Sequence, residues 1–207
     1  SGAFFSAEDA DSQGEEGLFY IWDANELKQS LDSSEYVFIK DILTIKDNGN
    51  CKLEGHRTNI PHINASAFKT LIDDSDKMAY YHSIRQKIYN NRKLRVHPQK
   101  DDKILTDWNG LMISALSRAA AITDNSEYKT VAVKSMDFIL NKLKNGDNRL
   151  FKRYRAGESS INGMIEDYSF MIWALIELYH LTFDVNYLKE AIKLSDYQLN
   201  NFWDSSK

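Results

Sequence analysis

Residues 106–113 read Thr-Asp-Trp-Asn-Gly-Leu-Met-Ile, and residues 166–172 read Glu-Asp-Tyr-Ser-Phe-Met-Ile. An offset of 60 residues places Asp107-Trp108 on Asp167-Tyr168. The same offset aligns Leu111-Met112 with Met171-Ile172, Ala115-Leu116 with Leu175-Ile176, and Asp124 with Asp184. After a deletion of one residue, Tyr128 meets Tyr187 and Ala132 meets Ala191. The chain therefore contains an internal repeat.

Each repeat has the pattern of a helical hairpin. Apolar residues at three- and four-residue spacing predict an amphipathic helix that begins near Trp108, with one buried stripe made of Trp108, Leu111, Met112, Ala115, Leu116 and Ala119. We expect further helices over residues 128–143, 164–181 and 187–202, and one that carries Met78, Tyr81, Ile84, Arg85 and Ile88. Pro98 separates this last helix from the one at Trp108, because proline forces its predecessor into extended geometry.

Hairpins of this kind bury their apolar faces by stacking on one another, either as an open solenoid or as a closed toroid. Six hairpins would need roughly 360 residues, so a chain of 207 residues supplies part of a ring. The prediction is a mainly α fold, a partial (α/α)6 toroid. Residues 1–207 form a fragment of a single toroid domain, with a small β-hairpin over residues 1–22 and helical hairpins over residues 23–207.

The predicted β-hairpin has two aromatic-rich runs, residues 2–6 and 17–22, on either side of an acidic stretch. Asp23 and Glu26 have the spacing of a capping box that opens a short helix through Leu31. Residues 36–43 fit a helix or a strand equally well. Residues 47–50, Asp-Asn-Gly-Asn, indicate a turn.

Composition excludes several classes of protein. With 26 basic and 30 acidic residues, the net charge is −4, which does not suit a nucleic-acid-binding protein. No apolar run is long enough to cross a bilayer, and the single cysteine, Cys51, excludes a disulfide framework. We expect a cytoplasmic protein with no nucleic-acid or membrane partner. Because Ser1 and not Met comes first, we also expect a piece of a longer chain.

Five stretches carry a resemblance to a known family. They are residues 6–12 (Ser-Ala-Glu-Asp-Ala-Asp-Ser), 14–17 (Gly-Glu-Glu-Gly), 19–22 (Phe-Tyr-Ile-Trp), 101–113 and 166–170. In these stretches the chain resembles the bacterial YyaL-like proteins and the animal spermatogenesis-associated protein 20 family. The resemblance implies a thioredoxin-like domain followed by an (α/α)6 toroid similar to six-hairpin glycosidases and N-acylglucosamine 2-epimerases. This chain is similar to the middle of that toroid.

The main candidate site lies at the two helix starts. If both helices line the ring, Asp107-Trp108-Asn109 and Glu166-Asp167-Tyr168 face the same mouth. Carboxylates, an amide and aromatic faces around one cavity suit a sugar. Asp107, Glu166 and Asp167 are the candidate catalytic acids, and Trp108, Asn109 and Tyr168 are candidate binding residues. Alternatively, the acids cap helices and the aromatic residues fill the core.

Other candidates are weaker. Asp9 and Asp11, in the acidic stretch, could contact a ligand or a cation, although the spacing does not fit a calcium-binding loop. Asp102, next to Lys103, could line the site or form a structural ion pair. His56 follows a glycine as in a segment of the resembled family. The basic stretch 149–155 could hold an anionic ligand or form an ordinary strand. Cys51 is taken as incidental, and we expect no metal and no cofactor.

Two functions follow. The first is a carbohydrate-binding or carbohydrate-modifying domain, glycosidase-like or epimerase-like by resemblance, with a small carbohydrate as partner. The second is a non-catalytic scaffold attached to the thioredoxin-like domain of the same longer chain. A metal-dependent hydrolase built on the acidic stretch is a distant third.

Overall fold

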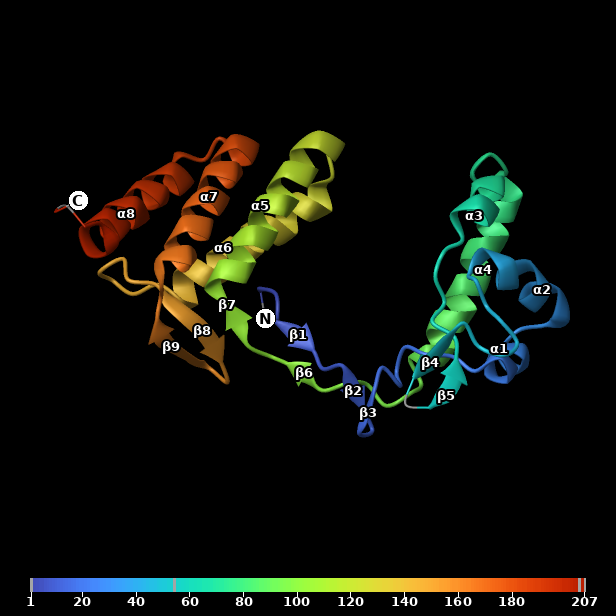
Figure 1. Ribbon diagram of the computed structural model, residues 1–207. Helices are drawn as coiled ribbons and strands as arrows, with labels where there is room; N and C mark the ends of the chain where they lie inside the picture. The colour runs from blue at the N-terminus through green and yellow to red at the C-terminus, as the bar shows by residue number, and fades with distance from the viewer. Residues whose placement is uncertain (1, 54, 205, 207) are drawn as a thin grey trace. The chain divides into compact units, whose positions relative to one another are not determined.

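The computed structural model describes residues 2–53, 55–204 and 206 (Figure 1). These residues form two compact units. Unit 1 contains the residues up to 7 and from 101 onward, and unit 2 contains residues 8–100. The chain passes between them at β1 (Ala7–Glu8) and at β6 (Lys100–Asp101). That the whole chain is a fragment of a single toroid domain stays a prediction.

Unit 1 consists of two helical hairpins and a small sheet. The first hairpin is α5 (Thr106–Thr123) with α6 (Ser126–Lys142), and the second is α7 (Ile165–Thr182) with α8 (Val185–Phe202). The antiparallel sheet has the order β7-β8-β9, with bounds Ile104–Leu105, Phe151–Arg155 and Glu158–Asn162. The predicted mainly α fold built of helical hairpins is confirmed.

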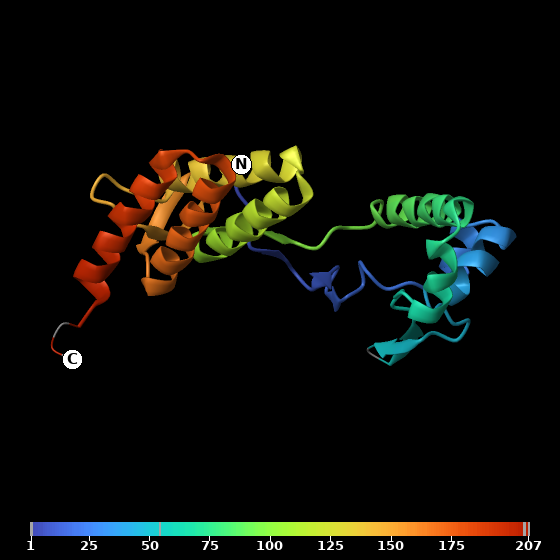
Figure 2. The ribbon, with the colours of Figure 1, turned by 90° about the horizontal axis from the view of Figure 1, so that it is seen from above.

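The helices α5 and α7 pack side by side, and each packs against the second helix of its own hairpin (Figure 2). Helices α5 and α7 run in the same direction, because the chain turns back along α6 between them and then reverses again before α7. Their shared core is made of side chains from all four helices and from the strands, including Ile104, Ile113, Met136, Ile139, Leu150, Tyr168, Met171, Leu175, Leu178 and Leu194. Both helix starts therefore lie at one corner of unit 1.

Gly110 sets how closely α5 and α7 approach. A Cβ atom at this position would lie 2.8 Å from the carbonyl carbon of Phe170 and 2.9 Å from its oxygen. Main-chain atoms cannot move aside as a flexible side chain would. Glycine is therefore required here for helix packing rather than for an unusual backbone angle.

The repeat is real, but its register differs from the sequence alignment. The first helices of the two hairpins start and end 59 residues apart, at Thr106 and Ile165 and at Thr123 and Thr182, and the second helices also start 59 residues apart. Asp124 is the left-handed residue that ends α5, with φ of 51°, and its equivalent is Phe183, with φ of 56°. The one-residue deletion therefore lies before the turn, and the predicted pairing of the two turn aspartates is wrong.

The described residues of unit 2 form four helices: α1 (Ala24–Ser30), α2 (Ser33–Ile42), α3 (Ala65–Ile72) and α4 (Ser75–Arg92). Its strands form two hairpins, β2 (Asp11–Ser12) with β3 (Glu15–Glu16) and β4 (Cys51–Leu53) with β5 (His56–Thr58). The core includes Trp22, Leu27, Ile39, Leu71, Tyr81 and Ile84. The ambiguous segment 36–43 is helical, within α2.

Arg95 ties the beginning of unit 2 to the end of α4. Its Nη1 donates to the carbonyl oxygens of Phe19 (2.9 Å) and Ile21 (2.7 Å), and its Nη2 donates to Glu26 (2.5 Å). Its guanidinium lies over the ring of Trp22. Glu26 therefore pairs with Arg95 and does not form the predicted capping box with Asp23. A capping box is formed instead by Asp32 and Glu35, at the start of α2.

A small N-terminal hairpin exists, but the aromatic runs are not its strands. β2 and β3 flank a tight turn at Gln13 and Gly14, whose φ angles of 57° and 84° suit a two-residue hairpin. Phe4 instead binds Asn109 of unit 1. The backbone of Phe19 is held by Arg95 in unit 2. The runs do not pair because each is held by a different unit.

No described helix is both long and apolar enough to span a bilayer.

We predict that Gly110→Ala destabilises unit 1 by about 1–3 kcal/mol, because the new methyl group overlaps the main chain of α7. Urea denaturation followed by tryptophan fluorescence measures this loss. Gly146→Ala is the control, since a Cβ there meets nothing within 4 Å. Equal stability of the two variants would show that the helices do not approach closely at Gly110.

Candidate functional site

A single buried carboxylate joins the starts of α5 and α7. Asp167 Oδ1 accepts a hydrogen bond from the backbone N–H of Asp107 (3.1 Å), and Asp167 Oδ2 accepts one from the backbone N–H of Met164 (2.8 Å). The first N–H groups of a helix have no partner within the helix. Asp167 satisfies one at each helix, and its negative charge lies at the positive ends of two helix dipoles.

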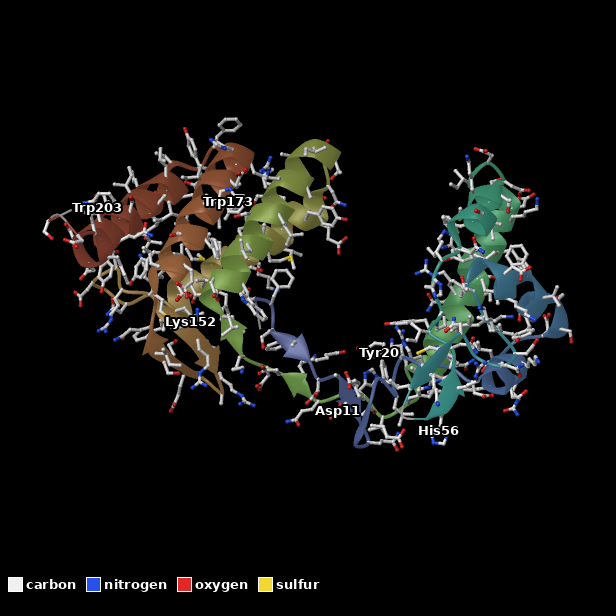
Figure 3. The ribbon with its side chains drawn as sticks, viewed as in Figure 1. Asp11, Tyr20, His56, Lys152, Trp173 and Trp203 are labelled. Carbon is white, nitrogen blue, oxygen red and sulfur yellow. The ribbon has the colours of Figure 1, made fainter. Side chains whose placement is uncertain are left out.

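Lys152, on β8, brings a cation to the same corner (Figure 3). Its Nζ lies 2.9 Å from Asp107 Oδ2, 3.5 Å from Glu166 Oε1 and 3.6 Å from Asp167 Oδ2. We call Lys152, Asp107, Glu166 and Asp167 the corner cluster. All three predicted catalytic acids therefore meet around one ammonium group.

Burial and charge act against each other within the corner cluster. Burial raises the pKa of Asp167, because the ionised carboxylate is removed from water. Burial also opposes the charge on Lys152, but the hydrogen bond to Asp107 and the surrounding carboxylates outweigh it, so the pKa of Lys152 is raised. Lys152 therefore stays protonated at neutral pH and acts as a cation rather than as a base.

The members of the corner cluster differ in how much of each side chain is exposed to a ligand. The Asp167 side chain is fully buried and the Asp107 side chain is 11% exposed, whereas the Glu166 side chain is 40% exposed. The nearest oxygens of Asp107 and Glu166 lie 2.9 Å and 3.5 Å from Lys152 Nζ. Lys152 lies between them. Glu166 is thus the accessible acid, and Asp167 is a positioning group.

The two aromatic residues predicted to bind a ligand, Trp108 and Tyr168, lie in different environments. Trp108 is 53% exposed and lines a shallow recess with Leu111, Met112 and Ala115. Tyr168 is buried, with its ring stacked on Tyr197 at 5.0 Å and its hydroxyl accepting from the backbone N–H of Leu150. Only Trp108 presents a ring to a ligand; Tyr168 fills the core, as the alternative interpretation of the sequence had it.

Asn109 is also committed to the fold. Its Oδ1 accepts from the backbone N–H of Phe4, and its Nδ2 donates to the carbonyl oxygens of Phe4 (3.1 Å) and Leu105 (2.8 Å). This buried amide holds the N-terminal segment against unit 1. Its hydrogen-bonding groups are used by the chain itself rather than offered to a ligand.

Of the remaining candidates, Asp102 has another partner in unit 1, and Asp9, Asp11 and His56 belong to unit 2. Asp102 forms an ion pair with Arg155 at 2.6 Å, with both side chains about half exposed. Asp9 and Asp11 are exposed, and Asp9 Oδ1 accepts from the backbone N–H of Asp11. His56, also exposed, lines a hollow of about 710 Å³ in unit 2. No trio of described His, Cys, Asp or Glu side chains is arranged to hold a metal ion.

Lys152 is the functional candidate that the sequence analysis did not single out. It belongs to the basic stretch 149–155, of which Phe151–Arg155 form strand β8. Alternate residues of a strand point to opposite faces. Arg153 therefore pairs with Ser160 and Arg155 with Asp102, on the face opposite Lys152. This alternation along the strand is the feature of the sequence that could have separated Lys152 from its neighbouring arginines.

We predict that Lys152→Met destabilises unit 1 by about 3 kcal/mol at neutral pH, since it leaves buried carboxylate charge without its cation. Because protonation removes that charge, the deficit narrows as the pH falls from 7 to 4. Urea denaturation at several pH values measures both effects. Lys103→Met, which breaks a more exposed pair with Asp101, serves as the control. A loss no larger than that of the control would contradict a structural role for Lys152.

No family model matches the chain. An uncharacterised protein of Caenorhabditis elegans is 30% identical over 242 residues, which cover 99% of this chain and 32% of that protein. Spermatogenesis-associated protein 20 of Rattus norvegicus is 28% identical and that of Homo sapiens 26%, each over 99% of this chain and 30% of the relative. The chain thus spans about a third of the length of the curated relatives that it matches.

Among solved structures, a protein of Listeria innocua matches 69% of this chain and 45% of its own, at 17% identity and a TM-score of 0.47. A family 76 glycoside hydrolase described as a mannosidase, from Bacteroides thetaiotaomicron, matches 67% of this chain and 42% of its own, at 14% identity and a TM-score of 0.45. The resemblance predicted from the five sequence stretches is confirmed by the sequence relatives: almost the whole of this chain is homologous to a part of the proteins named spermatogenesis-associated protein 20.

Proposed function

We propose that unit 1 binds a carbohydrate, or a similarly polyhydroxylated molecule, at the corner where α5 and α7 begin. One observation carries the proposal. Trp108, whose indole is exposed, directly follows Asp107, and Asp107 belongs to the corner cluster of three carboxylates and one ammonium group. An apolar ring face beside charged hydrogen-bonding groups is the combination that sugars require, since a sugar has an apolar face and a rim of hydroxyls.

Each group has a separate role in the proposed complex. The indole of Trp108 stacks on the apolar face of the sugar. Glu166 accepts hydrogen bonds from hydroxyls, and Lys152 donates one, because both side chains are partly exposed. Asp107 contacts the ligand through its exposed edge. Asp167, which the sequence analysis names as a candidate catalytic acid, acts here as a positioning residue, since both of its oxygens already accept backbone N–H groups.

The cluster also suits chemistry at a glycosidic bond. Asp107 and Glu166 are the two acids that a ligand can contact, and Lys152 holds a positive charge next to both. We propose them as the pair that acts on the sugar, with Glu166 as the more accessible member.

Trp108→Ala is expected to weaken saccharide binding at least tenfold, because stacking on the indole is lost. Calorimetric titration of this chain with a panel of mono- and oligosaccharides measures the affinities. Trp173→Ala is the matched control: this indole is 41% exposed on α7, and its Nε1 donates to Glu177. Equal losses in both variants would contradict the assigned site.

A specific observation favours a second candidate function, a non-catalytic scaffold. Both oxygens of Asp167 bind main-chain groups, and Lys152 offsets the neighbouring charge, as in a cluster that serves stability alone. The apolar recess at Trp108 would then contact protein. In this case no saccharide of the panel binds the wild-type chain, although Lys152→Met still lowers its stability.

A further inference from the structure

Unit 2 has a second hollow, separate from the one that His56 lines. It lies between the segment that carries Tyr20 and Trp22, the loop at Ile60 and Pro61, and one face of α4. Its volume is about 740 Å³, within the range of small-molecule sites. From α4 it is lined by His82, Arg85, Gln86, Ile88, Tyr89 and Arg92. We call it the α4 hollow.

The α4 hollow is basic, and none of the described residues that line it is acidic. Arg85 and Arg92 contribute two positive charges, and among the residues that the structure describes neither forms an ion pair. In a chain of net charge −4, such a pocket is a local exception. Uncompensated positive charge in a concave site attracts anions.

Arg92 and Arg95, three residues apart, have contrasting environments. Arg95 uses its guanidinium to bind three carbonyl oxygens and Glu26, so it is explained by the fold. The side chain of Arg92 has no hydrogen-bond partner among the residues that the structure describes, and its Nε is buried. A buried, unpaired donor is costly to keep. The fold alone therefore accounts for Arg95 but not for Arg92.

Aromatic rings hold Arg92 in place. Its guanidinium carbon lies 5.5 Å from the centre of the Tyr20 ring (labelled in Figure 3), 5.6 Å from that of Tyr89 and 5.5 Å from that of Phe19. The hydroxyl of Tyr20 donates to Glu8, which fixes that ring in turn. Tyr20 and Tyr89 are each about 40% exposed, so both still offer surface to a ligand. A held guanidinium beside exposed rings is a preorganised binding site.

We propose that the α4 hollow binds an organic phosphate that carries a ring. The phosphate accepts hydrogen bonds from Arg92 and Arg85, whose planar donor groups match phosphate oxygens. The ring stacks on Tyr20 and Tyr89. Two arginines suit the double charge of a phosphate monoester better than the single charge of a carboxylate. This site is independent of the saccharide site proposed in unit 1.

Calorimetric titration of this chain with phenyl phosphate tests the proposal, with inorganic phosphate, phenol and benzoate as comparison probes. We expect phenyl phosphate to bind at least tenfold more tightly than each of the other three. Arg92→Gln should weaken its binding at least tenfold, and Arg85→Gln several-fold. Lys69→Gln, which removes an exposed charge on α3 outside the hollow, should leave binding unchanged.

Several outcomes would overturn the proposal. If Lys69→Gln weakened the binding of phenyl phosphate as much as Arg92→Gln does, the binding would reflect a general attraction to positive charge rather than a specific site. Benzoate binding as tightly as phenyl phosphate would contradict the assignment of a phosphate. Circular dichroism of each variant verifies folding, and Tyr89→Leu, which keeps the arginines but removes a ring, must reduce the preference for phenyl phosphate over inorganic phosphate.

Discussion

The hydrogen bonds of one buried carboxylate organise unit 1. Asp167 accepts the backbone N–H groups of Asp107 and Met164, and Lys152 supplies the nearby cation. A buried charge is costly unless it is paired and hydrogen-bonded. Here two helix starts and one ammonium group meet that requirement together. Hence α5 and α7 begin at the same corner, and the close approach at Gly110 follows one turn later.

The same constraint determines what this corner can do. Asp167 is occupied by the main chain, so any chemistry falls to its neighbours Asp107, Glu166 and Lys152. Trp108 follows Asp107 on α5 and remains exposed, whereas Tyr168 follows Asp167 on α7 and is buried. Tyr168 is buried because its ring packs against Tyr197 and Phe202 of α8 and its hydroxyl accepts from the backbone N–H of Leu150. The corner thus combines one accessible ring with one accessible acid.

The sequence predicted the helices well and the details of the site less well. Periodicity located α5 to α8, and the repeat correctly indicated that Asp107 and Asp167 lie together. The predicted buried stripe of α5 was wrong, because Trp108, Leu111 and Met112 are exposed and the buried face carries small and polar residues such as Asn109 and Gly110. The repeat could not show that Lys152 pairs with both Asp107 and Asp167, since Lys152 lies on β8, outside the repeated hairpins and 45 residues from Asp107. Nor could spacing reveal that Tyr168 is buried, because core and exposed aromatics look alike in sequence. The prediction that the two aromatic-rich runs pair as one β-hairpin failed for a similar reason, because Phe4 and Phe19 pack in different units.

The direct test of this account is amide hydrogen exchange at Asp107 and Met164. Amides in the first turn of a helix normally exchange fast, because they lack a partner within the helix. If Asp167 binds both, their exchange should be as slow as that of the core of unit 1, and Asp167→Asn should accelerate both together. Fast exchange of the Asp107 amide in the wild-type chain would contradict the claim that one carboxylate joins the two helices.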